Sequence, residues 1–382
     1  MRRTIIGLDL EKEYSQISYY SERTGEPESV SIAENQDKYL IPTPDGLLTE
    51  KGKERIEELA DFIKKCLGYL NPAMEMPEVY MMVTMREMRQ PWIGRIRSAA
   101  EKLGIPGENL FLQSYRESFF YYVLNQKKEL WYHASALFEY NQSHISSWLM
   151  KTDSRTKPAL VRVLPGEKVE LGYPSGRSSE EWDTRRDQKF LELIQNTFRE
   201  EVVSSTFLIG DSFDKTWAVE SLQYLCRKRH VFQGKNLYTK GACYAMCRRL
   251  HIGKDLDNYL YASEDMVEYN IGMQMDIRGQ NTDYMLISAG INWYEAQCSC
   301  EILLKEGKEL VLYARSLRGG DASSFSITLD GLPDRPPKTT RLRLQLEFES
   351  ATTCRVRIKD LGFGEFYPSS GLTWESVLNM VQ

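Results

Sequence analysis

The spacing of hydrophobic and polar residues predicts a mixture of strands and helices in the first part of the chain. Apolar and β-branched residues run together over 4–10, and apolar and polar residues alternate over 14–20, so both segments are predicted to be strands. Over 51–70, apolar side chains recur at helical spacing and Asn71-Pro72 ends the run, which predicts a helix. The pattern continues with strands over 28–33, 79–84 and 109–113, a helix over 91–104, and a Tyr/Phe-rich helix ending near Asn125.

The next part of the chain repeats this order of elements. The repeat consists of strands within 134–150, 159–171 and 207–209 and helices over 182–203 and 215–228. A duplicated α/β pattern places ligands in the cleft between its two halves. We therefore predict a two-lobed α/β domain over 1–253, with lobes of about 1–130 and 131–253.

The last third of the chain alternates with period two. The segment 341–348 is the clearest example, because its apolar and charged side chains fall on opposite faces of an extended strand. Gly and Pro turns separate it from other alternating segments. The sequence therefore predicts an all-β sandwich domain over 267–382, with a linker over 254–266.

Composition adds limits on partners and location. At 382 residues the chain is longer than one hydrophobic core usually supports, which agrees with several domains. The net charge of −5 supplies no general attraction for phosphate groups, so we predict no nucleic-acid binding. The sequence has neither an export signal nor an apolar run long enough for a membrane span. Its seven cysteines lack disulfide or metal-site spacing, so we expect reduced thiols and a cytoplasmic protein.

Several short motifs follow one another in a recognisable order. They lie at 5–10, 39–43, 82–84, 136–139, 207–212, 240–242, 327–333 and 359–362. In this order they resemble the DnaK-type heat-shock chaperones of the actin-like ATPase superfamily, over roughly residues 4–370. The resemblance implies an α/β fold with a two-lobed actin-like ATPase (ribonuclease H-like) domain, followed by an all-β sandwich of the kind that binds chaperone substrates.

The resemblance also implies a nucleotide site between the lobes. Its residues would be Gly7, Asp9, Lys12, Glu139, Asn141, Gly210, Asp211 and Ser212, with ATP or ADP as the ligand. In this family the Asp of the first strand faces the metal-bound phosphates, so Asp9 would hold Mg²⁺ through water. The alternative reading of Asp9 is a residue that caps a turn at the end of a strand, and Gly210 is then a turn glycine.

The loops of this site depart from the family. Phosphate loops need glycine because backbone N–H groups must approach the phosphates closely. Here Glu11-Lys12-Glu13 and Tyr140-Asn141-Gln142-Ser143 replace the glycines, and the added carboxylates repel a triphosphate unless a metal or Lys12 compensates. The catalytic Glu of the family aligns with Ser114, which leaves Gln113 and Glu117 as candidate catalytic residues; their alternative roles are a helix cap and a solvated side chain. Any ATPase activity is expected to be weak.

The β-domain offers a second candidate site. A chaperone groove needs apolar residues that accept an extended peptide, and Met273, Met275, Ile277, Ala296 and Cys298 lie where that groove would form. Alternating apolar residues can equally be sandwich core. Only a short tail follows Gly371, so no helical lid is expected.

Three functions fit this sequence. The first is a DnaK-like protein-binding or scaffold protein with a degenerate nucleotide site and a protein or peptide partner. The second is a slow ATP-dependent chaperone-like ATPase in which nucleotide controls the β-domain. The third is a filament-forming actin-like protein, which the added β-domain disfavours.

Overall fold

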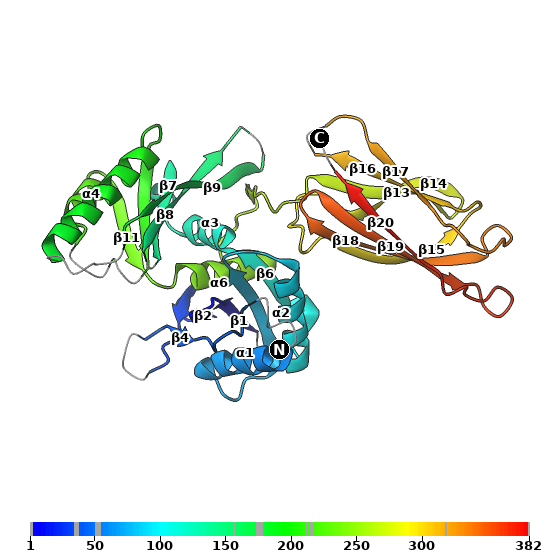
Figure 1. The fold of residues 1–382 in the computed structure, drawn as a ribbon, viewed down its shortest axis with the longest axis horizontal. Helices are drawn as coiled ribbons and strands as arrows, with labels where there is room; N and C mark the ends of the chain where they lie inside the picture. Colours follow the sequence, from blue (N-terminus) through cyan, green and yellow to red (C-terminus); the bar gives the residue numbers. More distant parts are fainter. Residues whose placement is uncertain are drawn as a thin grey trace. The chain divides into compact units, whose positions relative to one another are not determined.

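The structure is a computed structural model that describes residues 3–33, 38–49, 55–141, 143–155, 157–172, 179–210, 213, 217–317 and 319–380. The chain forms two compact units, Met1–Tyr261 and Ala262–Gln382 (Figure 1). Among the described residues, no helix is both long and apolar enough to cross a lipid bilayer.

The first sheet of the first unit combines a meander with parallel strands. Its strands are β1 (Thr4–Asp9), β2 (Tyr14–Ser21), β3 (Glu26–Ser29), β4 (Ile41–Pro42), β5 (Val79–Met85) and β6 (Leu110–Ser114). The order is β3-β2-β1-β5-β6, with β4 paired to β2. Strands β1, β5 and β6 are parallel because α1 (Ile56–Leu70) and α2 (Gln90–Leu103) connect them. The α2 helix ends at Gly104 in the left-handed conformation, as the sequence predicted.

The second sheet repeats this arrangement. Its strands are β7 (Ala134–Asn141), β8 (His144–Asp153), β9 (Ala159–Glu170), β10 (Val203–Ile209), β11 (His230–Gly234) and β12 (Tyr259–Tyr261), in the order β11-β10-β7-β8-β9-β12. The predicted mixed α/β class is confirmed.

Three boundaries predicted in this part of the chain need correction. The predicted helix over 182–203 is α4 (Ser179–Thr197), because residues from Val203 onward already belong to β10. The predicted helix over 215–228 is only α5 (Val219–Leu225). Part of the predicted linker over 254–266 is the strand β12, which pairs with β9.

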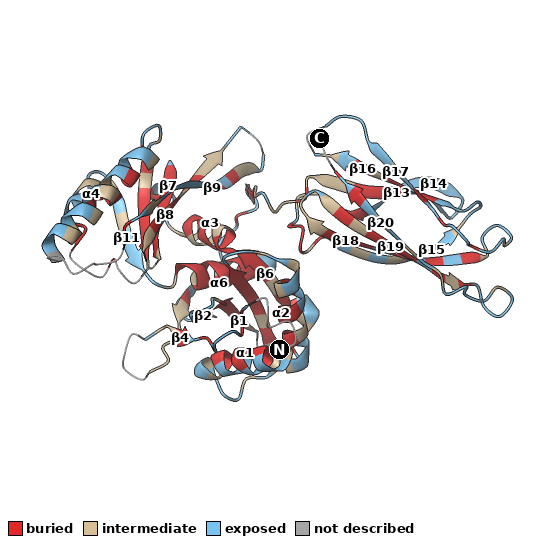
Figure 2. Cartoon of the chain, viewed as in Figure 1, coloured by how far each residue is buried: buried red, intermediate tan, exposed pale blue. Residues whose placement is uncertain are grey.

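Two helices each pack on the sheet of the other half. From α3 (Tyr115–Asn125), Phe119 and Phe120 join a core with Leu137 and Phe207 of the second sheet. From α6 (Leu237–Arg249), Ala242 and Met246 pack with Ile5 and Met82 of the first sheet, and α6 also contacts α3 (Figure 2). This exchange ties the two halves of the unit together.

The crossing of α3 and α6 requires glycine. A Cβ on Gly241 would lie 2.0 Å from the carbonyl oxygen of Ser118, so Gly241→Ala must push the helices apart. We expect a loss of about 2–3 kcal/mol of unfolding free energy, measured by urea denaturation. Gly68→Ala in α1 is the matched control, because no atom lies within 4 Å of its added Cβ. That variant should gain about 0.5–1 kcal/mol from its lower unfolded-state entropy. Equal stability of the two variants would contradict this account of the crossing.

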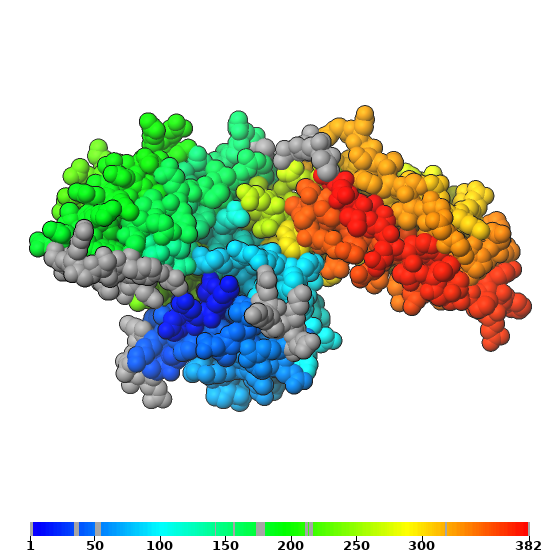
Figure 3. Space-filling view, viewed as in Figure 1, coloured from blue at the N-terminus to red at the C-terminus, as the bar shows by residue number. Residues whose placement is uncertain are grey.

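The second unit is rich in β-strands, as predicted, and contains two four-stranded antiparallel sheets. One has the order β14-β13-β16-β17 and the other β15-β18-β19-β20. Their strands are β13 (Tyr269–Ile277), β14 (Gln280–Ile287), β15 (Gln297–Leu304), β16 (Glu309–Ser316), β17 (Ser323–Thr328), β18 (Thr340–Ser350), β19 (Thr353–Gly362) and β20 (Thr373–Asn379). Along β18, Leu342, Leu344 and Leu346 are buried and the residues between them are exposed. The mostly exposed β20 runs along the surface shown in red in Figure 3. The sandwich packing of the two sheets stays a prediction.

Candidate functional site

The carboxyl ends of the first sheet place polar side chains side by side. Asp9 of β1 is in register with Gln16 of β2 and Thr84 of β5, and Thr84 is in register with Gln113 of β6. In open α/β sheets, ligands bind outside the carboxyl ends of the strands. A cavity of about 310 Å³ lies at this edge, and residues from both halves of the unit line it. It is the candidate site for the nucleotide that the resemblance implied.

Arg86, which directly follows β5, bridges the two halves across this cavity. Its Nη1 donates to Glu139 Oε2 at 2.9 Å and its Nη2 donates to Glu139 Oε1 at 2.8 Å. Its Nε donates to Glu11 Oε2 at 3.0 Å. A bidentate guanidinium–carboxylate pair is both strong and geometrically specific. Arg86 therefore links the end of β7 to the turn that follows β1, in the space where the resemblance would place phosphates.

Asp9 is held by a buried tyrosine. Tyr115, the first residue of α3, donates a hydrogen bond from Oη to Asp9 Oδ1 at 2.6 Å. The Tyr115 ring stacks on the Tyr238 ring, with 3.9 Å between the ring centroids. The Arg86 guanidinium carbon lies 5.1 Å from the Tyr115 ring centroid. Burial is the main cause that raises the pKa of Asp9 to about 8, against the hydrogen bond from Tyr115, which lowers it. Burial therefore favours the neutral form of Asp9.

The two glycines assigned to this site are explained by packing of the chain itself. A Cβ on Gly7 would lie 2.0 Å from the carbonyl oxygen of Thr239 in α6. Gly210 has a φ of +112°, and its Cβ would lie 2.1 Å from the carbonyl oxygen of Tyr140. Both positions exclude a side chain because another backbone segment of the same chain approaches them closely, so a nucleotide is not needed to explain these glycines.

The remaining predicted nucleotide residues are only partly brought together. Glu139 and Asn141 line the cavity with Asp9. Lys12 does not line this cavity and instead borders a second one in the first half of the unit. Asp211 and Ser212 lie outside the described residues.

The two candidate catalytic residues are buried away from the cavity. Gln113 Nε2 donates to Ser118 Oγ at 2.6 Å, and only 1% of Gln113 is exposed. The cap of α3 is Ser114, whose Oγ accepts from the backbone N–H of Glu117. Glu117 is buried, so its alternative reading as a solvated residue is wrong. Neither Gln113 nor Glu117 lines the cavity, and both are buried.

The cavity is lined by more acidic than basic side chains. Asp9, Glu11, Glu13 and Glu139 contribute carboxyl groups, and Arg86 and Lys235 contribute cationic groups, of which Arg86 is bound to Glu11 and Glu139. Carboxylates beside a triphosphate repel it by Coulomb's law. In the described part of the chain, no three His, Cys, Asp or Glu side chains come together as a metal-ligand set.

Sequence reasoning missed Arg86 and Tyr115. They directly follow β5 and β6 of the first sheet, at the same edge as Asp9. A charged residue at the carboxyl end of a buried parallel strand was the signal that could have identified Arg86. Its partner Glu139 could not be inferred, because 53 residues separate the two along the chain.

The predicted client-binding residues of the second unit differ in exposure. Met273 and Ala296 are 7% and 1% exposed, which agrees with their alternative reading as core residues. Met275 and Cys298 are half-buried, and Ile277 is exposed. Alternation along a strand predicts an apolar face but not what covers that face, so the sequence leaves both the groove and the core open for these five residues.

Comparison with known proteins identifies two family models, and the description of each states that its function is unknown. The model described as "Family of unknown function (DUF5716) C-terminal" matches residues 45–264, and "Domain of unknown function (DUF8552)" matches residues 266–380. No curated protein matches the sequence.

Two solved structures are similar to part of the chain. One is the inorganic polyphosphate/ATP-glucomannokinase from Arthrobacter sp. strain KM, at 13% identity and a TM-score of 0.39, covering 65% of this chain and 100% of that one. The other is a protein with an actin-like ATPase fold and unknown function from Bacteroides thetaiotaomicron, at 9% identity and a TM-score of 0.33, covering 64% of this chain and 96% of that one. Both scores are low, so the fold described here rests on this chain's own strands and helices. None of these descriptions names a chaperone, and the resemblance to DnaK stays a prediction.

Proposed function

The chain belongs to the DUF5716 family, and we propose that it is a protein-binding or scaffold protein whose cleft is closed by its own side chains instead of a nucleotide. The observation that carries this proposal is the bidentate ion pair between Arg86 and Glu139. It joins the two halves of the first unit in the cleft where the resemblance would place a nucleotide. The partner in this proposal is a protein or peptide.

The surroundings of the ion pair support the same proposal. Asp9 is hydrogen-bonded to Tyr115 and burial raises its pKa, so Asp9 would have to lose a proton before it could hold a metal-bound water. Neighbouring backbone of the chain itself fills the space beside Gly7 and Gly210. Slow ATP hydrolysis is the competing function, and it needs Asp9 to lose its proton and Arg86 to leave Glu139.

Thermal melting with Mg-ATP tests the proposal. We expect millimolar Mg-ATP to leave the melting temperature unchanged, because a ligand stabilises a protein only if it binds the folded state. The Arg86→Gln variant should show faster hydrogen exchange at the carboxyl ends of β1 and β7, because the link between the halves is lost. Arg89→Gln is the matched control, since the ion pair of Arg89 is with the nearby, exposed Glu87.

A nucleotide-dependent result would overturn the proposal. If Mg-ATP raises the melting temperature and Asp9→Ala abolishes that rise, the cleft is a nucleotide site and the ATPase reading is favoured. If a purified protein partner binds the full chain only in the presence of Mg-ATP, the nucleotide-independent scaffold is likewise wrong.

A further inference from the structure

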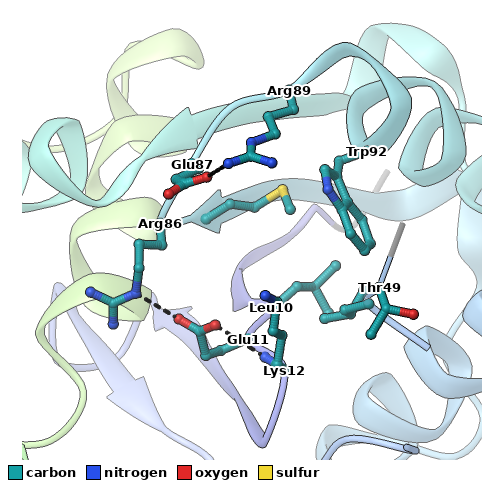
Figure 4. Close-up of a pocket in the computed structure, with 10 residues that line it drawn as sticks. Leu10, Glu11, Lys12, Thr49, Arg86, Glu87, Arg89 and Trp92 are labelled. Carbon is teal, nitrogen blue, oxygen red and sulfur yellow. Dashed lines mark hydrogen bonds and ion pairs between the residues drawn. The ribbon is translucent and has the colours of Figure 1, made fainter. Parts of the chain in front are cut away.

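A second cavity lies in the first half of the same unit, beside the ion pair of Arg86. It encloses about 290 Å³ between the carboxyl ends of β1 and β5 and the start of α2 (Figure 4). Small-molecule sites begin near this size, and they combine an apolar lining with a few polar groups.

The inner surface of this cavity is apolar. Leu10, Leu48 and Met85 line it, and each is at most 6% exposed. The indole of Trp92 forms the opposite side (Figure 4). A flat apolar body would lose its water-exposed surface between Trp92 and these side chains.

A buried arginine holds the walls of the cavity in place. Arg95 Nη2 donates to the carbonyl oxygen of Leu47 at 2.7 Å, and its guanidinium lies 4.7 Å from the Trp92 ring centroid. Only 6% of Arg95 is exposed. Arg95 therefore fixes the segment that carries Leu48 against the helix that carries Trp92, and the cavity is formed before a ligand enters.

The rim of the cavity carries several charged side chains, and most of them are paired. Glu11 is paired with Arg86, which also binds Glu139, and Glu87 is paired with Arg89 (Figure 4). Lys12 is also at the rim and is exposed. Within the described residues, its ammonium group has no ion-pair partner. One uncommitted positive charge favours a ligand with one negative charge.

We propose that this cavity binds a small organic monocarboxylate with a flat apolar body, such as an aromatic acid. The apolar body lies against Trp92, and the carboxylate pairs with Lys12. A cationic ligand is disfavoured by Lys12, and a polyphosphate finds only one uncommitted cation in the described rim. The site goes beyond the proposed function and holds whether or not the neighbouring cleft takes a nucleotide.

Methyl NMR of the full chain, labelled at its methionine methyl groups, tests this site. The signal of Met85 is identified by its loss in Met85→Leu. We expect 3-phenylpropanoate to shift the Met85 signal in a saturable way, and the neutral 3-phenylpropanamide to bind about tenfold more weakly, because the charged hydrogen bond to Lys12 is lost. Mg-ATP is titrated separately, so failure of this site and failure of the proposed function give different results.

Two variants locate the binding. Lys12→Gln should weaken 3-phenylpropanoate about tenfold, whereas Lys64→Gln, at an exposed position of α1, should leave the affinity unchanged. Thr49→Trp, at an exposed position of the rim, should fill the cavity and abolish the shift without removing a core side chain. Absence of a saturable Met85 shift at millimolar acid overturns the site, and equal binding of acid and amide overturns its preference for anions.

Discussion

Asp9→Asn is expected to stabilise the first unit, by about 2–4 kcal/mol at pH 8. Wild-type Asp9 has a pKa of about 8 in the folded chain against an ordinary value of 3.8, because burial disfavours its charge. The folded state therefore binds more protons than the unfolded state between these values, and wild-type stability falls as pH rises through this window. Asparagine accepts the hydrogen bond from Tyr115 without a titrating group.

The pH dependence separates this effect from a general change in packing. Urea denaturation of wild type and Asp9→Asn should give nearly equal stabilities near pH 4 and a difference that grows up to about pH 8. Asp61→Asn, at an exposed position of α1, is the matched control and should change stability by less than about 0.5 kcal/mol. A destabilised Asp9→Asn protein at pH 8 would show that Asp9 is ionised in the folded chain. That result would favour the metal-binding role of Asp9.

Asp360→Ala is expected to destabilise the second unit by about 3–5 kcal/mol, because it leaves a buried arginine unpaired. Arg335 Nη1 and Nη2 each donate to an Asp360 oxygen at 2.8 Å, and these side chains are 5% and 0% exposed. The backbone N–H groups of Gly362 and Ser370 also donate to Asp360. Asp360 thus binds backbone N–H groups near both ends of the segment that connects β19 to β20.

Hydrogen exchange at increasing urea concentration, read on peptides from β18 and β19, measures this loss. Glu301→Ala is the matched control, because Glu301 pairs with Arg343 between exposed side chains and should cost about 1 kcal/mol or less. The double variant Arg335→Met, Asp360→Leu should lose less than Asp360→Ala, since no charge stays buried. A loss from Asp360→Ala no larger than that from Glu301→Ala would contradict this account.

The same pair makes the second unit sensitive to acid. Burial would raise the pKa of Asp360, but Arg335 and the N–H groups of Ser370 and Gly362 outweigh burial and hold the pKa below its usual range. Its contribution to stability is present above the ordinary pKa of Asp and is lost as pH falls toward the lowered value. Asp9 and Asp360 therefore act in opposite directions as pH falls.

The sequence by itself determined many of the strands and helices of this protein, though not all of their boundaries. The segments 4–10, 14–20 and 79–84 are strands and 91–104 contains a helix, because local spacing of apolar residues decides which face of an element can be buried. Alternation over 341–348 predicted a strand with one buried face for the same reason. The position of Asp9 at the end of a strand also followed from this local pattern.

Only the tertiary structure decided what meets at the site. Glu139 pairs with Arg86, Tyr115 with Asp9, and Gly241 with Ser118, and each pair joins segments far apart in the sequence. Local periodicity carries no information about such partners, since it reports burial but not the residue that covers a face. The raised pKa of Asp9 is likewise a tertiary property, because it depends on burial by neighbouring side chains.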